Sequence, residues 1–149
     1  MLLAEAIKER QLCYNKMQFT SRLIKCMSTV RVVGNEERNH KVVKNAMSEY
    51  NALHDKHQRF ELLISRSEST TVINLSESVN ITMVDAKNLI ESYNSKLMFF
   101  QSLLANIGSN GDGAEYLDAE ELKDAIFDLL EDITNLNSKI EYLMWSTEV

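Results

Sequence analysis

The sequence places two histidines and a glutamate at helical spacing, as His54-x-x-His57-x-x-x-Glu61. Residues three or four apart on a helix lie on neighbouring turns, so both imidazoles and the carboxylate could face one side. Two histidines and one carboxylate are a known ligand set for zinc and for non-haem iron. A polar break in an apolar helical seam, which fixes register, gives the same spacing. We expect this second role, with no bound metal or cofactor, and keep the metal-dependent enzyme as an alternative.

A second candidate for chemistry is the stretch NIGSNGDGAEYLDAEEL, which looks like a calcium loop. An EF-hand loop needs an Asp at its first position, a Gly at its sixth and a Glu at its twelfth. With Gly113 at the sixth position, Gly108 falls at the first and Ala119 at the twelfth. Because both essential ligands are missing, we predict that the stretch binds no calcium. We expect Gly108 to end one helix, and Asp118 with Glu121 to cap the next.

Composition favours long helices. The chain has 149 residues, no proline and only four glycines, and proline is the residue that most strongly interrupts a helix. No apolar run is long enough to span a bilayer, and the first residues carry charges where a signal peptide is apolar. We therefore expect a cytoplasmic protein, and two cysteines fit a reducing compartment.

The two cysteines, Cys13 and Cys26, fall on one predicted helix. A rise of about 1.5 Å per residue separates them by roughly 20 Å, which is too far for a disulfide within the chain. We predict that both are small buried hydrophobic residues.

Apolar residues recur at alternating spacings of four and three in three separate segments, which predicts amphipathic helices with one apolar seam each. The three seams are Val43, Ala46, Tyr50, Leu53, His57, Phe60 and Ile64; Ala86, Ile90, Tyr93, Leu97, Phe100, Leu104 and Ile107; and Leu122, Ile126, Leu129, Ile133, Leu136, Ile140 and Leu143.

The first segment differs because it carries two apolar stripes. The first stripe comprises Leu3, Ala6, Cys13, Met17, Ile24 and Met27, and the second comprises Leu12, Phe19, Leu23, Cys26 and Val30. A helix that is apolar on two sides should contact neighbours on two sides. We therefore expect this helix to be the most enclosed one, either in a bundle or between subunits.

These patterns predict a mainly all-α fold in one domain over residues 1–149. We expect an elongated antiparallel helical hairpin or a four-helix, coiled-coil-like bundle, with a small β-hairpin between the second and third helices. Predicted helices cover about 2–32, 36–67, 83–107 and 119–146, with the β-hairpin at 70–81. Gly34 and Asn35 are the expected caps between the first two helices, and Thr82 with Asp85 forms a capping box for the third.

Charge is unevenly distributed along the chain. Residues 1–66 hold 12 Lys and Arg against 7 Asp and Glu, whereas residues 67–149 hold 4 against 15. The simplest explanation is that the basic half faces an acidic half, in the same chain or in a neighbour. A nucleic-acid-binding helical arm is the alternative, although no aromatic residues interleave the basic ones. Its candidate residues are Arg22, Lys25, Arg31, Arg38, Lys41 and Lys44.

Several short motifs resemble the septicolysin-like family of small bacterial proteins. They are LAEAIKER near the start, LISR before two threonines, NITMVDA after the predicted β-hairpin, and MWSTEV at the end. The family pattern has an Ile and a Thr where this chain has Ser67 and Ser69, and it has a turn glycine that this chain lacks. The resemblance implies a helical protein without an assigned biochemical activity, and it carries over no site residues.

We therefore predict a non-enzymatic structural or interaction protein that forms homo-oligomers through long amphipathic helices. The alternatives are the nucleic-acid-binding arm, the metal-dependent enzyme and a membrane-active, cytolysin-like protein. Among the aromatic residues, Phe99 marks a contact with another chain if it is exposed, and Trp145 is expected to anchor the last helix.

Overall fold

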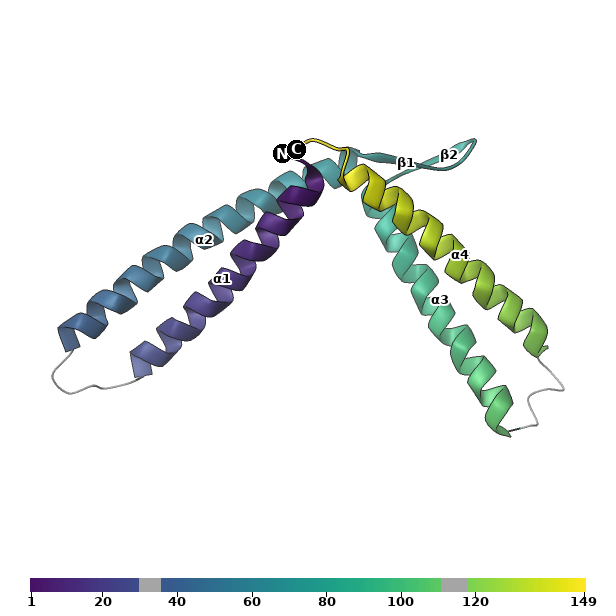
Figure 1. The fold of residues 1–149 in the computed structure, drawn as a ribbon, viewed down its shortest axis with the longest axis horizontal. Helices are drawn as coiled ribbons and strands as arrows, with labels where there is room; N and C mark the ends of the chain where they lie inside the picture. The colour runs from purple at the N-terminus through teal and green to yellow at the C-terminus, as the bar shows by residue number, and fades with distance from the viewer. Residues whose placement is uncertain (30–35, 111–117) are drawn as a thin grey trace. The chain divides into compact units, whose positions relative to one another are not determined.

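The computed structural model describes residues 1–29, 36–110 and 118–149. For residues 36–37 and 108–110 it describes the backbone only. The described chain forms four helices and one β-hairpin (Figure 1). In chain order the elements are α1 (Leu3–Thr29), α2 (Glu36–Thr70), β1 (Val72–Ser76), β2 (Val79–Thr82), α3 (Met83–Asn110) and α4 (Ala119–Met144).

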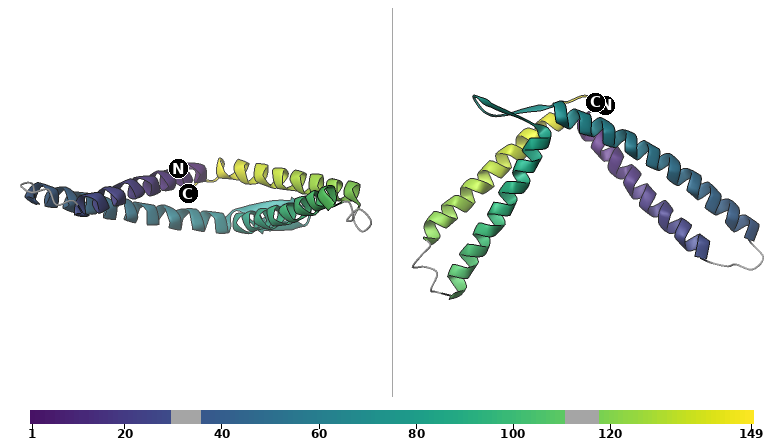
Figure 2. Two further views of the ribbon diagram at one scale, coloured as in Figure 1. Left: turned by 90° about the horizontal axis from the view of Figure 1, so that it is seen from below. Right: turned by 180° about the vertical axis from the view of Figure 1, so that it is seen from behind.

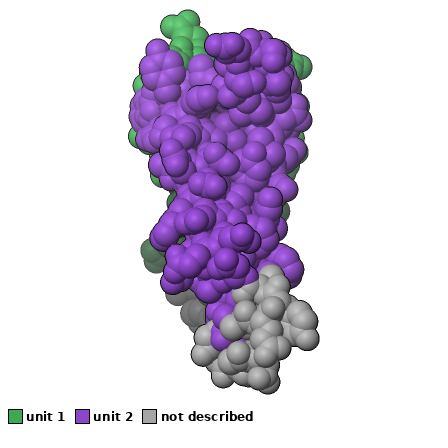
Figure 3. Space-filling view, turned by 90° about the vertical axis from the view of Figure 1, so that its right-hand side faces the viewer, with its two compact units in different colours: residues 1–67, 146–149 green, residues 68–145 purple. Residues whose placement is uncertain are grey.

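The chain divides into two compact units, which Figure 3 colours separately. Unit 1 contains residues 1–67 and 146–149, and unit 2 contains residues 68–145. Each unit is built on one pair of helices, α1 with α2 in unit 1 and α3 with α4 in unit 2. The prediction that residues 1–149 act as one domain stays a prediction.

In unit 1, α1 and α2 lie side by side and run in opposite directions, as the views in Figures 1 and 2 agree. The first stripe of α1 is buried at Leu3, Ala6, Cys13 and Met17. The predicted seam of α2 contributes buried residues at its two ends, namely Ala46, Phe60 and Ile64. The 4–3 spacing therefore selects the face that each helix turns inward.

The two ends of the described chain are joined within unit 1. Leu2 and Glu148 form an isolated antiparallel β-bridge. The Leu3 amide donates to the Thr147 carbonyl at 2.8 Å, and the Val149 amide donates to the Met1 carbonyl at 3.0 Å. These bonds tie the last four residues to the start of α1.

In unit 2, α3 and α4 pack along their predicted seams. Leu97, Leu122, Ile126 and Leu129 form a buried cluster, and Tyr93, Phe100, Leu103, Leu104, Ile107 and Ile133 pack against it. Farther along α4, Leu136 and Ile140 are also buried. The seam of α4 is thus buried or half-buried over its whole length.

The β-hairpin precedes α3 and lies in unit 2. Its strands are antiparallel, with Ile73 opposite Ile81 and a bulge between Asn74 and Ser76. Two strands alone are marginally stable in water, so the hairpin needs support from helices. Ile73 is almost fully buried, and the Lys139 amine of α4 donates to the Asn74 carbonyl at 2.9 Å.

Side-chain caps begin two helices as predicted. At α3, the Asp85 amide donates to the Thr82 hydroxyl at 3.1 Å, and that hydroxyl donates to the Asp85 carboxylate at 2.8 Å. At α4, the Asp118 carboxylate accepts from the amides of Glu120 and Glu121. Each cap satisfies backbone donors that have no partner inside the helix.

The predicted fold class is confirmed: the protein is mainly all-α, with four helices and a small β-hairpin between α2 and α3. Two boundaries are wrong: α2 continues past 67 to Thr70, so the β-hairpin begins at Val72, and α3 continues through Gly108 to Asn110, so the glycine does not end the helix. A single glycine weakens a helix by only about 1 kcal/mol, which neighbouring turns offset. The expected caps Gly34 and Asn35, and the calcium-like positions at 111–117, lie outside the described residues. None of the described helices combines the length and apolar character needed to cross a membrane.

Two adjacent residues of α3 provide a matched test of the unit 2 seam. Leu97 is 9% exposed and its neighbour Met98 is 70% exposed. We expect Leu97→Ala to lower the free energy of unfolding by about 2–5 kcal/mol, because it leaves a cavity in the core. Met98→Ala should change it by no more than about 0.5 kcal/mol. Urea denaturation followed by circular dichroism measures both, and equal losses would contradict the assigned seam.

Candidate functional site

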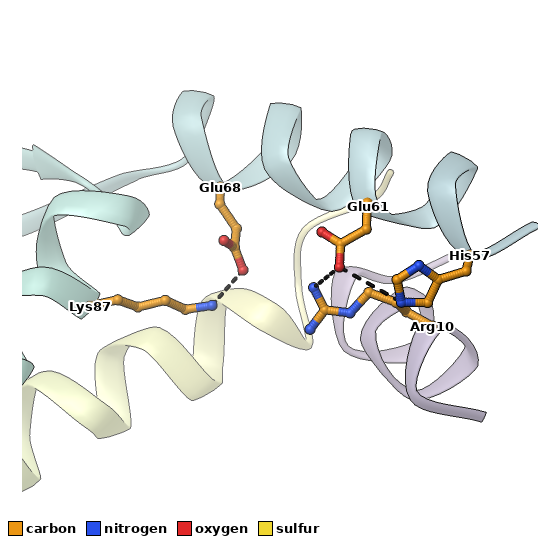
Figure 4. Close-up of polar contacts among 5 residues, drawn as sticks. All are labelled: Arg10, His57, Glu61, Glu68 and Lys87. Carbon is orange, nitrogen blue, oxygen red and sulfur yellow. Dashed lines mark hydrogen bonds and ion pairs between the residues drawn. The ribbon is translucent and has the colours of Figure 1, made fainter. Parts of the chain in front are cut away.

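A polar cluster of four side chains joins the two helices of unit 1. Arg10 comes from α1, and His57 and Glu61 come from α2 (Figure 4). The fourth residue, Tyr14, also belongs to α1. The Arg10 Nη1 atom lies 3.2 Å from the Glu61 Oε1 atom, and the His57 Nε2 atom lies 3.9 Å from the same oxygen. The rings of Tyr14 and His57 are tilted, with centroids 6.2 Å apart. With Gln11, these residues line an open pocket of about 320 Å³.

Helix geometry explains why these four residues meet. On α1, Tyr14 lies one turn after Arg10. On α2, His57 lies one turn before Glu61, so that Arg10 meets Glu61 and Tyr14 meets His57. This is the register of two antiparallel helices, in which residues four apart lie on the same face. Arg10 and Tyr14 were not predicted as members of the site. Their position beside the buried stripe of α1 was the signal that pointed toward α2.

The three candidate metal ligands do not converge on one point. His54 stacks against Tyr50, with ring centroids 6.4 Å apart, and its Nδ1 atom lies 3.9 Å from Asp55. Only His57 and Glu61 face each other, and Arg10 already pairs with that glutamate. In the described part of the chain, no group of three His, Cys, Asp or Glu residues is arranged to hold a metal ion.

The polar cluster is suited to holding the antiparallel helices α1 and α2 in one register. A second ion pair, between Lys56 of α2 and Glu9 of α1, spans the same two helices at 3.3 Å. In unit 2, Lys87 of α3 pairs with Glu68 at the end of α2 in the same manner (Figure 4). The unit 1 pairs are partly exposed, so each contributes at most about 1 kcal/mol to stability. Their positions favour one register of α1 against α2.

The candidate nucleic-acid residues gather at one end of unit 1. Arg22 and Lys25 lie near the end of α1, and Arg38, Lys41 and Lys44 lie near the start of α2. All five are exposed. The antiparallel pairing brings these two segments to the same end of the hairpin (Figure 1). The sixth candidate, Arg31, lies outside the described residues.

The second apolar stripe of α1 is exposed, so within this chain α1 is covered along only one of its two stripes, and the expected second neighbour stays a prediction. Phe19 is 71% exposed, and Leu12 and Leu23 are also exposed. At about 100° per residue, these three side chains point about 140° to 180° away from Tyr14, which contacts α2. The pair of helices in unit 1 therefore covers one side of α1 and leaves this stripe in solvent. We call Leu12, Phe19 and Leu23 the α1 stripe.

Cys26 continues the α1 stripe by one more turn. It is exposed, whereas Cys13 is buried, and both thiols are free. The prediction of two buried cysteines is thus correct for Cys13 and wrong for Cys26. The reason is the same as for Phe19, because Cys26 belongs to the stripe that turns away from α2. Phe99 on α3 is exposed as well. From the sequence, an exposed Phe99 is expected to mark a contact with another chain.

The hairpin of unit 2 forms one further hollow with α4. This open pocket of about 580 Å³ is lined by Val72, Ile73, Asn74, Ser138, Lys139, Tyr142 and Leu143. Most of its surface is apolar. Lys139 already donates to the Asn74 carbonyl, so its amine supports the hairpin.

Comparisons with family models, curated proteins and solved structures find no match to this chain. The resemblance to the septicolysin-like family stays a prediction. The proposals below therefore stand on the geometry of the chain itself.

The arrangement of His54, His57 and Glu61 leads to a prediction for metal content. Metal analysis of the purified protein should give a zinc and iron stoichiometry near zero, because the three side chains do not share a centre. Added zinc should leave the melting temperature unchanged. A stoichiometry near one per chain that His57→Ala removes and His40→Ala keeps would contradict this. His40 is an exposed histidine of α2 outside the cluster and serves as the control.

Proposed function

We propose that this chain is a non-enzymatic, cytoplasmic interaction protein that assembles with copies of itself through its amphipathic helices. The observation that carries the proposal is the α1 stripe, a row of large apolar side chains on the outside of a helix that is already paired. The small number of cysteines fits a reducing compartment. The septicolysin-like resemblance agrees with a helical protein of this kind.

The physical reason for association is the cost of leaving the α1 stripe in water. Burying one Phe or Leu side chain stabilises a complex by about 1.5–3 kcal/mol. Three such side chains give a gain comparable to the lower estimates of the entropy lost when two molecules join. Scattered apolar residues are normal on protein surfaces, but Leu12, Phe19 and Leu23 are large, exposed and lie on one side of α1.

The spacing of the stripe supports a helical partner. Leu12 and Phe19 are seven residues apart, and Leu23 follows four residues later. This is the spacing of a seam that packs against another helix, as in coiled coils. The chain offers helices with exposed apolar residues on both units, so a second copy supplies suitable partners.

A single charge placed in the α1 stripe should weaken self-association. We expect Phe19→Asp to reduce the average mass in solution at a concentration where the unaltered protein is oligomeric, because the carboxylate would have to be desolvated at the contact. Gln18→Asp introduces the same charge one residue away, outside the stripe, and should leave the mass unchanged. Sedimentation velocity measures both variants.

Two results would contradict this proposal. The unaltered protein could remain a monomer over the whole accessible concentration range, or Phe19→Asp and Gln18→Asp could associate equally well. Circular dichroism and thermal melting establish that both variants keep their helices, since Phe19 and Gln18 are exposed and make no part of the buried seam.

The second candidate function is nucleic-acid binding. It is favoured by one observation, the gathering of Arg22, Lys25, Arg38, Lys41 and Lys44 at one end of unit 1. The affinity of basic side chains for phosphates falls steeply as the salt concentration rises, because binding releases counterions.

An electrophoretic shift assay with tRNA and with duplex DNA at low salt separates the two candidates. Binding that falls with added salt and is lost in Lys41→Glu/Lys44→Glu would establish the second candidate. No binding at low salt would remove it and leave self-association as the function.

A further inference from the structure

A surface of α4 in unit 2 carries an exposed phenylalanine and leucine, as the α1 stripe does, but acidic residues lie beside them instead of basic ones. Phe127 is 64% exposed, and Leu130 on the next turn is also exposed. Asp124 and Glu131 are exposed and lie three residues before and four residues after Phe127, and the exposed Lys123 is the one cation within a turn of that ring along the described helix α4. We call Phe127, Leu130, Asp124 and Glu131 the α4 patch.

The α1 stripe has a related layout with basic residues. Phe19 has Leu23 on the next turn, and Lys16 and Arg22 lie three residues before and after it. Both basic residues are exposed, and neither forms an ion pair within the described part of the chain. An aromatic ring flanked by two cations on one helix thus corresponds to an aromatic ring with more carboxylates than cations around it on another.

The charge of the two units strengthens this match. Unit 1 carries 12 Lys and Arg against 8 Asp and Glu, a net charge of +4, and unit 2 carries 4 against 14, a net charge of −10. Contacts between two copies of unit 1, or between two copies of unit 2, would bring like charges together. Contacts between unit 1 of one copy and unit 2 of another bring opposite charges together.

We propose that the α1 stripe of one copy docks on the α4 patch of a second copy, with Lys16 and Arg22 facing Asp124 and Glu131. This inference rests on the proposed self-association and names the surface that takes part in it. The apolar residues supply the stabilisation, and the charges select the partner surface and the direction of approach. Because each copy carries both surfaces, two copies can supply each other, or further copies can add on.

The exposed residues of α3 are a poorer partner for the α1 stripe. Met98 and Phe99 are exposed, but the charged residue one turn before Phe99 is Lys96. No acidic residue lies within one turn of Phe99 along the described helix α3, whereas Asp124 and Glu131 outnumber Lys123 around Phe127. Of these two surfaces, only the α4 patch is therefore acidic enough to attract Lys16 and Arg22.

Paired charge reversals test the inference. The first variant carries Lys16→Glu/Arg22→Glu, and the second carries Asp124→Lys/Glu131→Lys. Each variant alone should self-associate at least about tenfold more weakly than the unaltered protein, because its two surfaces then carry the same sign. An equal mixture of the two should associate again, since the reversed stripe of one faces the reversed patch of the other. Sedimentation velocity with one variant fluorescently labelled measures the mixed complex directly.

The control is Asn51→Glu/Gln58→Glu/Arg59→Glu, which changes the net charge of unit 1 by the same amount at exposed positions of α2. It should associate like the unaltered protein. Circular dichroism and melting curves show whether each variant keeps its helices.

The outcomes separate the inference from the function on which it rests. An unaltered protein that is monomeric at every concentration overturns both. An oligomeric protein whose variants still associate, or whose mixture fails to associate, overturns only the pairing of the α1 stripe with the α4 patch.

Discussion

A contact between two helices buries one stripe of each, and the organisation of this protein follows from that limit. In unit 2, the seams of α3 and α4 meet around Leu97 and Ile126, and one stripe from each helix is enough. In unit 1, α1 has two apolar stripes but is paired along only one of them. Phe19 and its neighbours are therefore exposed while Cys13 and Met17 are buried. The surplus of apolar surface, more than any arrangement of reactive groups, is the property that a function must use.

Regular spacing was sufficient to predict the helices and their inward faces. The alternation of four and three places Leu122, Leu129 and Leu136 on the buried side of α4, and Asp118 caps that helix as expected. Periodicity states which residues share a face, but it does not state how many neighbours a helix has. For this reason the sequence predicted a second neighbour for α1 and a buried Cys26, whereas the second stripe and Cys26 are exposed in this chain. Glycine was likewise a weak guide at 108, because the helix tolerates it.

The polar cluster shows a different limit of sequence analysis. The spacing of His57 and Glu61 correctly brings the two side chains to one face of α2, since one helical turn separates them. Arg10 and Tyr14 come from α1, and only the register of the two antiparallel helices brings them there. That register changes the chemistry of the cluster, because a guanidinium takes the carboxylate that a metal would need. The sequence shows that basic residues concentrate in the first half of the chain and acidic residues in the second. It does not show which of them lie together on an exposed face.

The bridge between Leu2 and Glu148 has a consequence for how the chain acquires its structure during synthesis. Residues 68–145 form a unit of neighbouring segments and emerge from the ribosome together, so their contacts close short loops and form early. In unit 1 the pairing of α1 with α2 also joins neighbouring segments, but the Thr147 carbonyl that accepts from Leu3 follows unit 2 in the sequence. This bond therefore forms only after residues 68–145 have been synthesised, and until then the start of α1 lacks this partner.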